Sequence, residues 1–159
     1  MTDTVATETP GVSVVVITLN EEHNIRECLD SLVALDYPKN RLEILVVDAS
    51  SDSTARIAAE YAHGRVISCD KGFARQKNVG LDAAIYDIIA FTDADCIALP
   101  HWLTSAVGGL EDPHVTGVGG NAFPPPDTGF FGRCVAAVGH PAGGSIGFEA
   151  NVDPSCAEG

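Results

Sequence analysis

Three short runs of almost uninterrupted apolar residues constrain the fold of this chain most strongly. They lie at Val12–Thr18, Leu42–Val47 and Ile88–Thr92, and the first of them, VSVVVIT, is rich in β-branched residues. Runs of this length without polar alternation are typical of strands that are buried on both faces, as in parallel sheets. Because segments with helical spacing lie between them, the chain predicts an α/β fold with a mostly parallel central sheet and helices on both faces.

The remaining elements follow from start and stop signals. Helices are expected to begin near Glu22, at Asp52 or Ser53, at Phe73 and at Pro100. Gly64 is expected to end the second of these helices. Two further short strands are expected, at Arg65–Ser68 and Val115–Val118.

Composition limits the classes of protein that this chain can represent. With 159 residues and 45% hydrophobic content, it predicts one globular domain with a substantial core. The formal net charge is −13, from 22 acidic and 9 basic residues, which argues against general nucleic-acid binding because that needs a basic face. The five cysteines include no C-x-x-C pair, so we expect reduced thiols rather than a zinc site.

The two ends of the chain differ from its middle. Residues 1–10 are polar and acidic, without the basic and apolar regions of a signal peptide, and are expected to form a disordered tail. Residues 122–159 are rich in Gly and Pro, show no sustained period and are expected to be irregular. No apolar run approaches the roughly 18 residues of a membrane helix, so we expect a cytoplasmic location.

The most informative polar residues directly follow the run Ile88–Thr92. Asp93 and Asp95 are one residue apart, at the carboxyl end of a predicted strand, where open α/β sheets bind ligands. If the chain stays extended there, both carboxylates point the same way and can share one cation. Mg²⁺ or Mn²⁺, itself bound to a phosphate, is the natural candidate. The alternative is a solvated acidic turn, a common place for Asp.

Other polar groups are predicted to lie at the same edge of the sheet. Thr18, Asn20 and Glu21 follow the first strand, and Asp48 follows the second. Lys71, Arg75 and Lys77, three of only nine basic residues, are clustered around the start of the predicted helix at Phe73. Together these groups suggest a diphosphate site. For the basic residues, the alternative is a solvated basic face. Asp48 can instead accept hydrogen bonds from a base or sugar hydroxyl.

Three familiar motifs are absent from the sequence. There is no G-x-G-x-x-G after the first strand, no G-x-x-x-x-G-K-[ST] and no G-x-S-x-G. A dinucleotide-binding fold, a P-loop enzyme and a serine hydrolase of the nucleophile-elbow type are therefore disfavoured.

Four blocks of sequence, in this order and spacing, carry a family resemblance: VSVVVITLNEE, LEILVVDASSDST, GFARQKNVGLDAA and IIAFTDADC. They resemble the nucleotide-binding half of family 2 glycosyltransferases, which have the Rossmann-like GT-A sandwich fold. The resemblance covers residues 11–121, which it implies are a nucleotide-diphospho-sugar-binding domain. It is specific because four blocks agree in order.

The resemblance also implies roles for particular residues. Asp93 and Asp95 match the Asp-x-Asp motif that holds ribose and the metal-bound diphosphate, and Asp48 matches an aspartate near the nucleobase. Lys77 stands where the family often has an Arg close to the diphosphate. Two departures are that Ala49 replaces a frequent second acidic residue, and that Lys77 keeps the charge but lacks the bidentate fork of Arg. The expected metal ligands are Asp95 and Asp93, and the expected donor-binding residues are Thr18, Asn20, Glu21, Asp48, Lys71, Arg75, Lys77 and Asp93.

The expected activity is metal-dependent transfer of a sugar, with inversion, from a nucleotide-diphosphate sugar to an acceptor. In the family, the acceptor half and a catalytic carboxylate come well after the Asp-x-Asp motif, so we expect both beyond Gly159. The acceptor, whether glycan, lipid or protein, stays open, and membrane association, at the cytoplasmic face, is expected only through that further part. The alternatives are a nucleotide-sugar-binding fragment without transfer activity and a nucleotidyltransferase.

Overall fold

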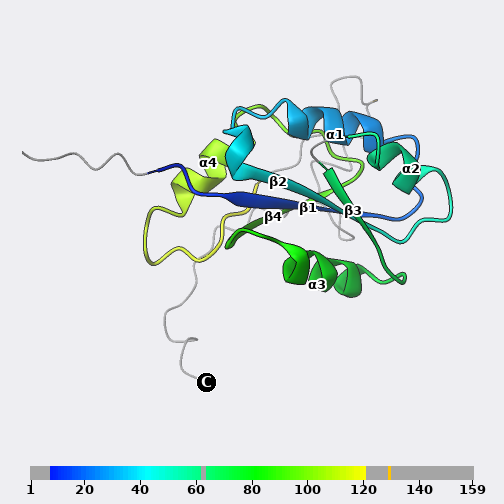
Figure 1. Cartoon of the computed structure of the whole chain (residues 1–159). Helices are drawn as coiled ribbons and strands as arrows, with labels where there is room; N and C mark the ends of the chain where they lie inside the picture. The colour runs from blue at the N-terminus through cyan, green and yellow to red at the C-terminus, as the bar shows by residue number, and fades with distance from the viewer. Residues whose placement is uncertain (1–7, 62–63, 121–128, 130–159) are drawn as a thin grey trace, which may run out of the picture. The chain divides into compact units, whose positions relative to one another are not determined.

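The computed structural model describes residues 8–61, 64–120 and 129, and the chain divides into two compact units, Met1–Val107 and Gly108–Gly159. The first unit contains one sheet of four strands, which Figure 1 shows. These are β1 (Val12–Thr18), β2 (Leu42–Asp48), β3 (Gly64–Ser68) and β4 (Ile88–Asp93), in the spatial order β3-β2-β1-β4. Every pairing is parallel, which confirms the predicted parallel sheet.

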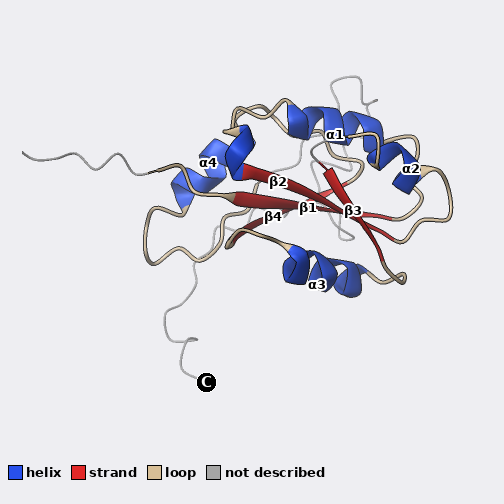
Figure 2. Ribbon diagram, viewed as in Figure 1, coloured by secondary structure: helices blue, strands red, loops and turns tan. Residues whose placement is uncertain are grey.

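Helices cover both faces of this sheet, as predicted (Figure 2). On one face lie α1 (Ile25–Val33) and α2 (Thr54–Ala58), and the start of α4 (Trp102–Gly109) packs into the same core. On the other face lies α3 (Phe73–Ala83), and a short 3₁₀ helix, η1 (Lys39–Arg41), precedes β2. No helix among the described residues has the length and apolar character to cross a membrane.

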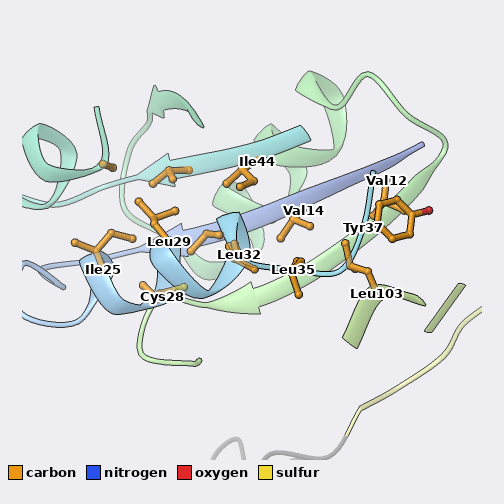
Figure 3. Packing of buried hydrophobic residues seen from close by; sticks show 14 residues of the cluster. Val12, Val14, Ile25, Cys28, Leu29, Leu32, Leu35, Tyr37, Ile44 and Leu103 are labelled. Atoms are coloured by element: carbon orange, nitrogen blue, oxygen red, sulfur yellow. The ribbon is translucent and has the colours of Figure 1, made fainter. Parts of the chain in front are cut away.

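The central strand β1 is buried on both faces, which explains its continuous apolar sequence. Its even-numbered residues, such as Val14, pack with Leu29 and Leu32 of α1 (Figure 3). Val15 faces the opposite side and packs with Val47 and residues of α3. The strand therefore carries two hydrophobic cores, one against each helical layer.

Gly80 allows α3 to pack closely on the sheet. A Cβ atom at this position would lie 2.4 Å from Cγ1 of Val15, closer than any ordinary contact. Glycine is therefore required here by the short distance between helix and strand rather than by a turn.

Several predicted boundaries are wrong in informative ways. Helix α1 begins at Ile25 rather than near Glu22, because the amides of Glu21 and Glu22 donate to side chains of the segment after β2. Gly64 does not end α2, which stops at Ala58; it is the first residue of β3. The fifth strand predicted at Val115–Val118 does not form. That run contains Gly117 and has no neighbouring strand to pair with among the described residues.

The predicted terminal segments fall largely outside the described residues. Of the tail at residues 1–10, only 8–10 are described, and of the irregular segment at 122–159, only Gly129 is described. Glu8 forms an ion pair with Arg41, and the carbonyl of Pro10 accepts a hydrogen bond from the Tyr37 hydroxyl at 2.6 Å.

Candidate functional site

The carboxyl ends of three strands bring the predicted site residues to one edge of the sheet. In the strand register, Asp48 of β2 stands opposite Thr18 of β1, and Asp93 of β4 stands opposite Ile17 of β1. The two aspartates therefore flank the end of β1 on its two sides, which confirms the predicted shared edge. Helix α3 also begins at this edge, because it follows the carboxyl end of β3 after a short loop.

Asp93 and Asp95 lie in a turn that begins at the last residue of β4. Strand β4 ends at Asp93, and the amide of Cys96 donates to the Asp93 carbonyl at 3.2 Å. The thiol of Cys28 on α1 donates to the same carbonyl at 3.6 Å, and Ala94 between the two aspartates is buried. The assumption that the chain stays extended here is therefore wrong, because the hydrogen bond between the Cys96 amide and the Asp93 carbonyl closes a turn over Ala94 and Asp95. Both aspartates are exposed.

The surroundings of this turn are negative. Within the described residues, neither aspartate has a Lys or Arg nitrogen within 4.0 Å. Burial, together with Cys96, Asp95 and Asp93, raises the pKa of the Cys28 thiol to about 12. Burial, followed by the charges of Asp95 and Asp93, also raises the pKa of Cys96. Without a bound metal, both thiols are therefore protonated at neutral pH.

The exposed oxygens of Asp93 and Asp95 suit a hard divalent cation. Among the described residues there is no cluster of three or more His, Cys, Asp or Glu that could enclose a metal. A cation at this turn would therefore take only part of its coordination from the protein. Mg²⁺ is usually bound in this way, through one or two carboxylates together with substrate phosphates and water.

Asp48 is held very differently from the two aspartates of the turn. It is buried, its Oδ1 accepts a hydrogen bond from the Thr18 hydroxyl at 2.6 Å, and its Oδ2 accepts one from the Ser50 amide at 3.2 Å. The carboxylate therefore has a fixed orientation at the edge of the sheet. A rigid acceptor of this kind can recognise a directional donor group.

Gln76 is a residue of this edge that the sequence analysis missed. It is buried, and its amide nitrogen donates to the carbonyls of Thr18, at 2.8 Å, and Val47, at 2.9 Å. It thereby ties α3 to the ends of β1 and β2. The signal in the sequence was a polar residue on the same helical face as Val79 and Gly80, which is otherwise apolar.

The loops after β1 and β2 are joined by side-chain hydrogen bonds. Asn20 lies in the left-handed region at φ 60°. Its side-chain oxygen accepts from the Ser51 amide at 3.0 Å, and its backbone amide donates to the Ser50 hydroxyl at 2.8 Å. The Glu21 amide donates to the Thr54 hydroxyl at 2.9 Å, and its carboxylate accepts from the side chain of Asn24. The side-chain oxygens of Asn20 and Glu21 thus already accept hydrogen bonds within these loops.

The three basic residues of the predicted cluster do not form one charged face. The Arg75 guanidinium lies 2.5 Å from Asp70 in an exposed ion pair, and Lys71 is exposed. Lys77 is half-buried, with its ammonium 4.2 Å from the centre of the Phe73 ring and 5.1 Å from that of Phe91. The three cations therefore have three different environments.

An open hollow of about 590 Å³ lies beside the end of β3 and the first turns of α3. Its lining includes Arg75 but neither Asp93 nor Asp95, so it is not the carboxylate turn itself. It is connected to Asp48 through the backbone, because the Cys69 amide in its wall donates to the Asp48 carbonyl at 2.9 Å. The lining consists of Ser68, Cys69, Asp70, Arg75 and Val79.

Comparisons with known proteins identify relatives in sequence and in structure. The family described as Glycosyl transferase family 2 matches residues 13–135. Glycosyltransferase AglE of Haloferax volcanii is 34% identical over 119 residues, which are 70% of this chain and 39% of that protein. This chain therefore spans about two-fifths of the length of that relative.

Solved structures give the same result. The mannosyltransferase PcManGT from Pyrobaculum calidifontis, in complex with GDP-Man and Mn²⁺, has a TM-score of 0.65 at 34% identity, over 69% of this chain and 34% of its own. TarS residues 1–349 of S. aureus, in complex with UDP-GlcNAc, has a TM-score of 0.60 at 30% identity, over 72% of this chain and 37% of its own. Because the family match covers most of the chain and the parallel sheet is that of the GT-A fold, this chain belongs to glycosyl transferase family 2.

Proposed function

We propose that this chain binds a nucleotide-diphosphate sugar and is part of an enzyme that transfers the sugar to an acceptor with inversion, in a reaction that depends on Mg²⁺ or Mn²⁺. The observation that carries this proposal is the shared edge, where Asp48 and the turn of Asp93 and Asp95 flank the end of β1. It is supported by solved relatives that bind GDP-Man with Mn²⁺ and UDP-GlcNAc.

The residues at the edge divide into four groups by their proposed role. Asp95 and Asp93 would hold the cation, whose chemistry is to neutralise charge on the diphosphate leaving group. Asp93 would also approach the ribose, and Asp48 would accept from the nucleobase. Lys77 would bind the diphosphate, with smaller contributions from Lys71 and from Arg75, which must first leave Asp70. Thr18, Asn20 and Glu21 would shape the donor site through the hydrogen bonds that fix Asp48 and the two loops.

Electrostatics supports the metal requirement. The chain carries a formal net charge of −13, and the two aspartates of the turn have no cationic partner among the described side chains. A diphosphate brought to these carboxylates without a divalent cation would be repelled. Donor binding is therefore expected to need the metal.

The catalytic base is not assigned to any described residue. Inverting transfer needs a base within hydrogen-bond reach of the acceptor hydroxyl, about 2.6–3.2 Å. Asp93 and Asp95 would be occupied by the cation and the ribose, and a metal-bound carboxylate is a weak base. We propose that the base belongs to a part of the protein outside the described residues.

Family membership favours sugar transfer over nucleotidyl transfer, since the curated relatives AglE and TarS are both named as glycosyl- or glucosaminyltransferases. Binding without transfer is the second candidate, and it is favoured for residues 1–159 in isolation because no base is assigned among those described. Product analysis separates the two. Release of free nucleoside diphosphate together with a glycosylated acceptor indicates transfer, whereas binding alone leaves the donor intact.

Calorimetry with GDP and UDP tests the binding part of the proposal. We expect at least one of them to bind in the presence of Mn²⁺ and to lose most of its affinity when EDTA replaces the metal. Asp95→Asn should have the same effect as EDTA. The matched control is Asp82→Asn, which removes one exposed carboxylate near the other end of α3 and should leave binding unchanged. Equal affinity with and without EDTA would remove the metal from the proposal.

A further inference from the structure

We propose that Phe73 and Phe91 are positioning residues for donor binding, which hold the ammonium of Lys77 at the site edge with its charge free for the diphosphate. This inference rests on the proposed function, because it assigns a role in binding the same donor. It concerns two aromatic residues that the sequence analysis treated only as parts of a helix and a strand.

The first observation is the position of the ammonium between the two rings. It lies 4.2 Å from the centre of Phe73 and 5.1 Å from the centre of Phe91, both within the range of a cation–π contact. The rings come from different elements, since Phe73 is the first residue of α3 and Phe91 is in β4. Lys77 is therefore held from the helix and from the sheet together.

The second observation is that Lys77 keeps its full charge. Within the described residues, no carboxylate oxygen lies within 4.0 Å of its ammonium, whereas Arg75 on the same helix is already paired with Asp70. An aromatic ring attracts a cation without neutralising it. The contacts therefore reduce the freedom of a flexible side chain while they leave its charge for an anion.

The third observation is the direction in which this arrangement places the charge. Phe91 and Asp93 are two residues apart in β4 and so lie on the same face of the sheet. A lysine side chain on a helix leans toward the helix N-terminus, which for α3 is the end at the site edge. The Lys77 ammonium thus contacts Phe91, which lies two residues before the proposed metal ligand Asp93 in the same strand.

Phe73 is largely exposed. The residue is 63% exposed, so its packing contributes little to the core, while its ring contacts the Lys77 ammonium. The same exposure makes Phe73 the better site for a test, because substitution there is not expected to disturb the core.

The experiment measures the affinity of the 159-residue chain for GDP and UDP, each with Mn²⁺, and for guanosine and uridine. Lys77→Met should weaken binding of the diphosphate by roughly ten- to 150-fold, as expected for loss of a charge-assisted bond. Phe73→Leu should weaken it by about two- to fivefold, the value of an exposed cation–π contact. Phe73→Tyr, which keeps the ring, should restore it. Nucleoside binding should not change in any variant.

Two controls separate positioning from a general structural effect. Phe73→Leu should have no further effect in a Lys77→Met background, because its role acts only through that ammonium. Leu81→Ala, at another exposed apolar residue of α3, should leave affinity unchanged. In NMR spectra, the Lys77 Hε protons should show an upfield ring-current shift that Phe73→Leu reduces.

The outcomes distinguish this inference from the proposed function. If neither GDP nor UDP binds the parent chain, the proposed function fails, while the ring-current shift still tests the contact. If the parent binds and Phe73→Leu binds equally well or more tightly, or if its effect persists without Lys77, the positioning role is wrong. An equal loss with Phe73→Leu and Phe73→Tyr also overturns it.

Discussion

The two ends of the sheet both carry acidic residues but treat them in opposite ways. Where the strands begin, Glu43 is buried, and its Oε2 accepts from the Ser13 hydroxyl at 2.5 Å and the Ile85 amide at 2.9 Å, while its Oε1 accepts from Arg65 at 2.9 Å. Where the strands end, Asp93 and Asp95 are exposed and lack a cationic partner among the described side chains.

The difference shows that residue type alone does not determine the role of a carboxylate. A buried carboxylate must have its hydrogen bonds satisfied by the protein, so Glu43 is committed to the fold. The exposed carboxylates of the turn make no ion pair of this kind among the described residues, so the fold does not depend on them. Asp48 lies where the strands end, which is the second end of the sheet, but like Glu43 it is buried and accepts hydrogen bonds from the protein.

The largest loss of stability is expected for a substitution at Glu43, where the strands begin. Glu43→Ala should lower the free energy of unfolding by about 3 kcal/mol, because it leaves the Ser13 hydroxyl and the Ile85 amide without their acceptor and removes the ion pair of Arg65. Urea denaturation measures this value. Nucleotide binding by the folded fraction should be unaffected. A loss below about 0.5 kcal/mol, the range of ordinary surface substitutions, would contradict a structural role for Glu43.

A smaller loss is expected for the bond that orients Asp48. Thr18→Val keeps the shape of the side chain and removes the donor to a buried carboxylate oxygen, so it should cost about 2 kcal/mol. The control is Thr104→Val, at an exposed threonine of α4, which should cost much less. Equal losses in the two variants would mean that the bond to Asp48 has no special value.

Removal of an exposed carboxylate at the second end should not destabilise the chain. Asp93→Asn and Asp95→Asn each remove one of two neighbouring like charges from a chain of formal charge −13. The free energy of unfolding should therefore stay within about 0.5 kcal/mol of the parent or rise slightly. Urea denaturation without metal or nucleotide measures it. A loss as large as that of Glu43→Ala would break the contrast between the two ends.

The smallest effect concerns acid titration of the loop after β2. Hydrogen bonds from the Thr54 hydroxyl and amide lower the pKa of Asp52 below its usual value. A lowered pKa contributes stability that is present above the unfolded-state pKa and is lost as the pH falls through the folded-state value. NMR should therefore show Asp52 titrating below 3.8, the ordinary value, and returning toward it in Thr54→Val. Titration at or above that value in the parent would show that the hydrogen bonds from Thr54 do not lower the pKa of Asp52.

The sequence by itself determined the architecture and the edge that carries the site. The apolar runs at Val12–Thr18, Leu42–Val47 and Ile88–Thr92 are strands to within one residue. Their continuous hydrophobicity predicts burial on both faces and hence a parallel sheet between helical layers. Strands β1 and β2 are buried in this way. Strand β4 lies at the edge of the described sheet and has no buried residue, so the burial predicted for Ile88–Thr92 is wrong. Since parallel strands end at one edge, the positions of Asp48 and Asp93 at a common edge followed from the sequence as well.

Only the tertiary structure decided which polar groups are already occupied. Asp48 receives its hydrogen bond from Thr18, thirty residues earlier, and the acceptors of Gln76 belong to two strands. The Lys77 ammonium contacts the ring of Phe91 in β4, which no helical pattern predicts. Local sequence signals report spacing along one element, whereas hydrogen bonds and cation–π contacts join elements that meet only when the chain folds. For that reason the sequence named the candidate side chains, and the packing separated those that hold the fold from those left for a ligand.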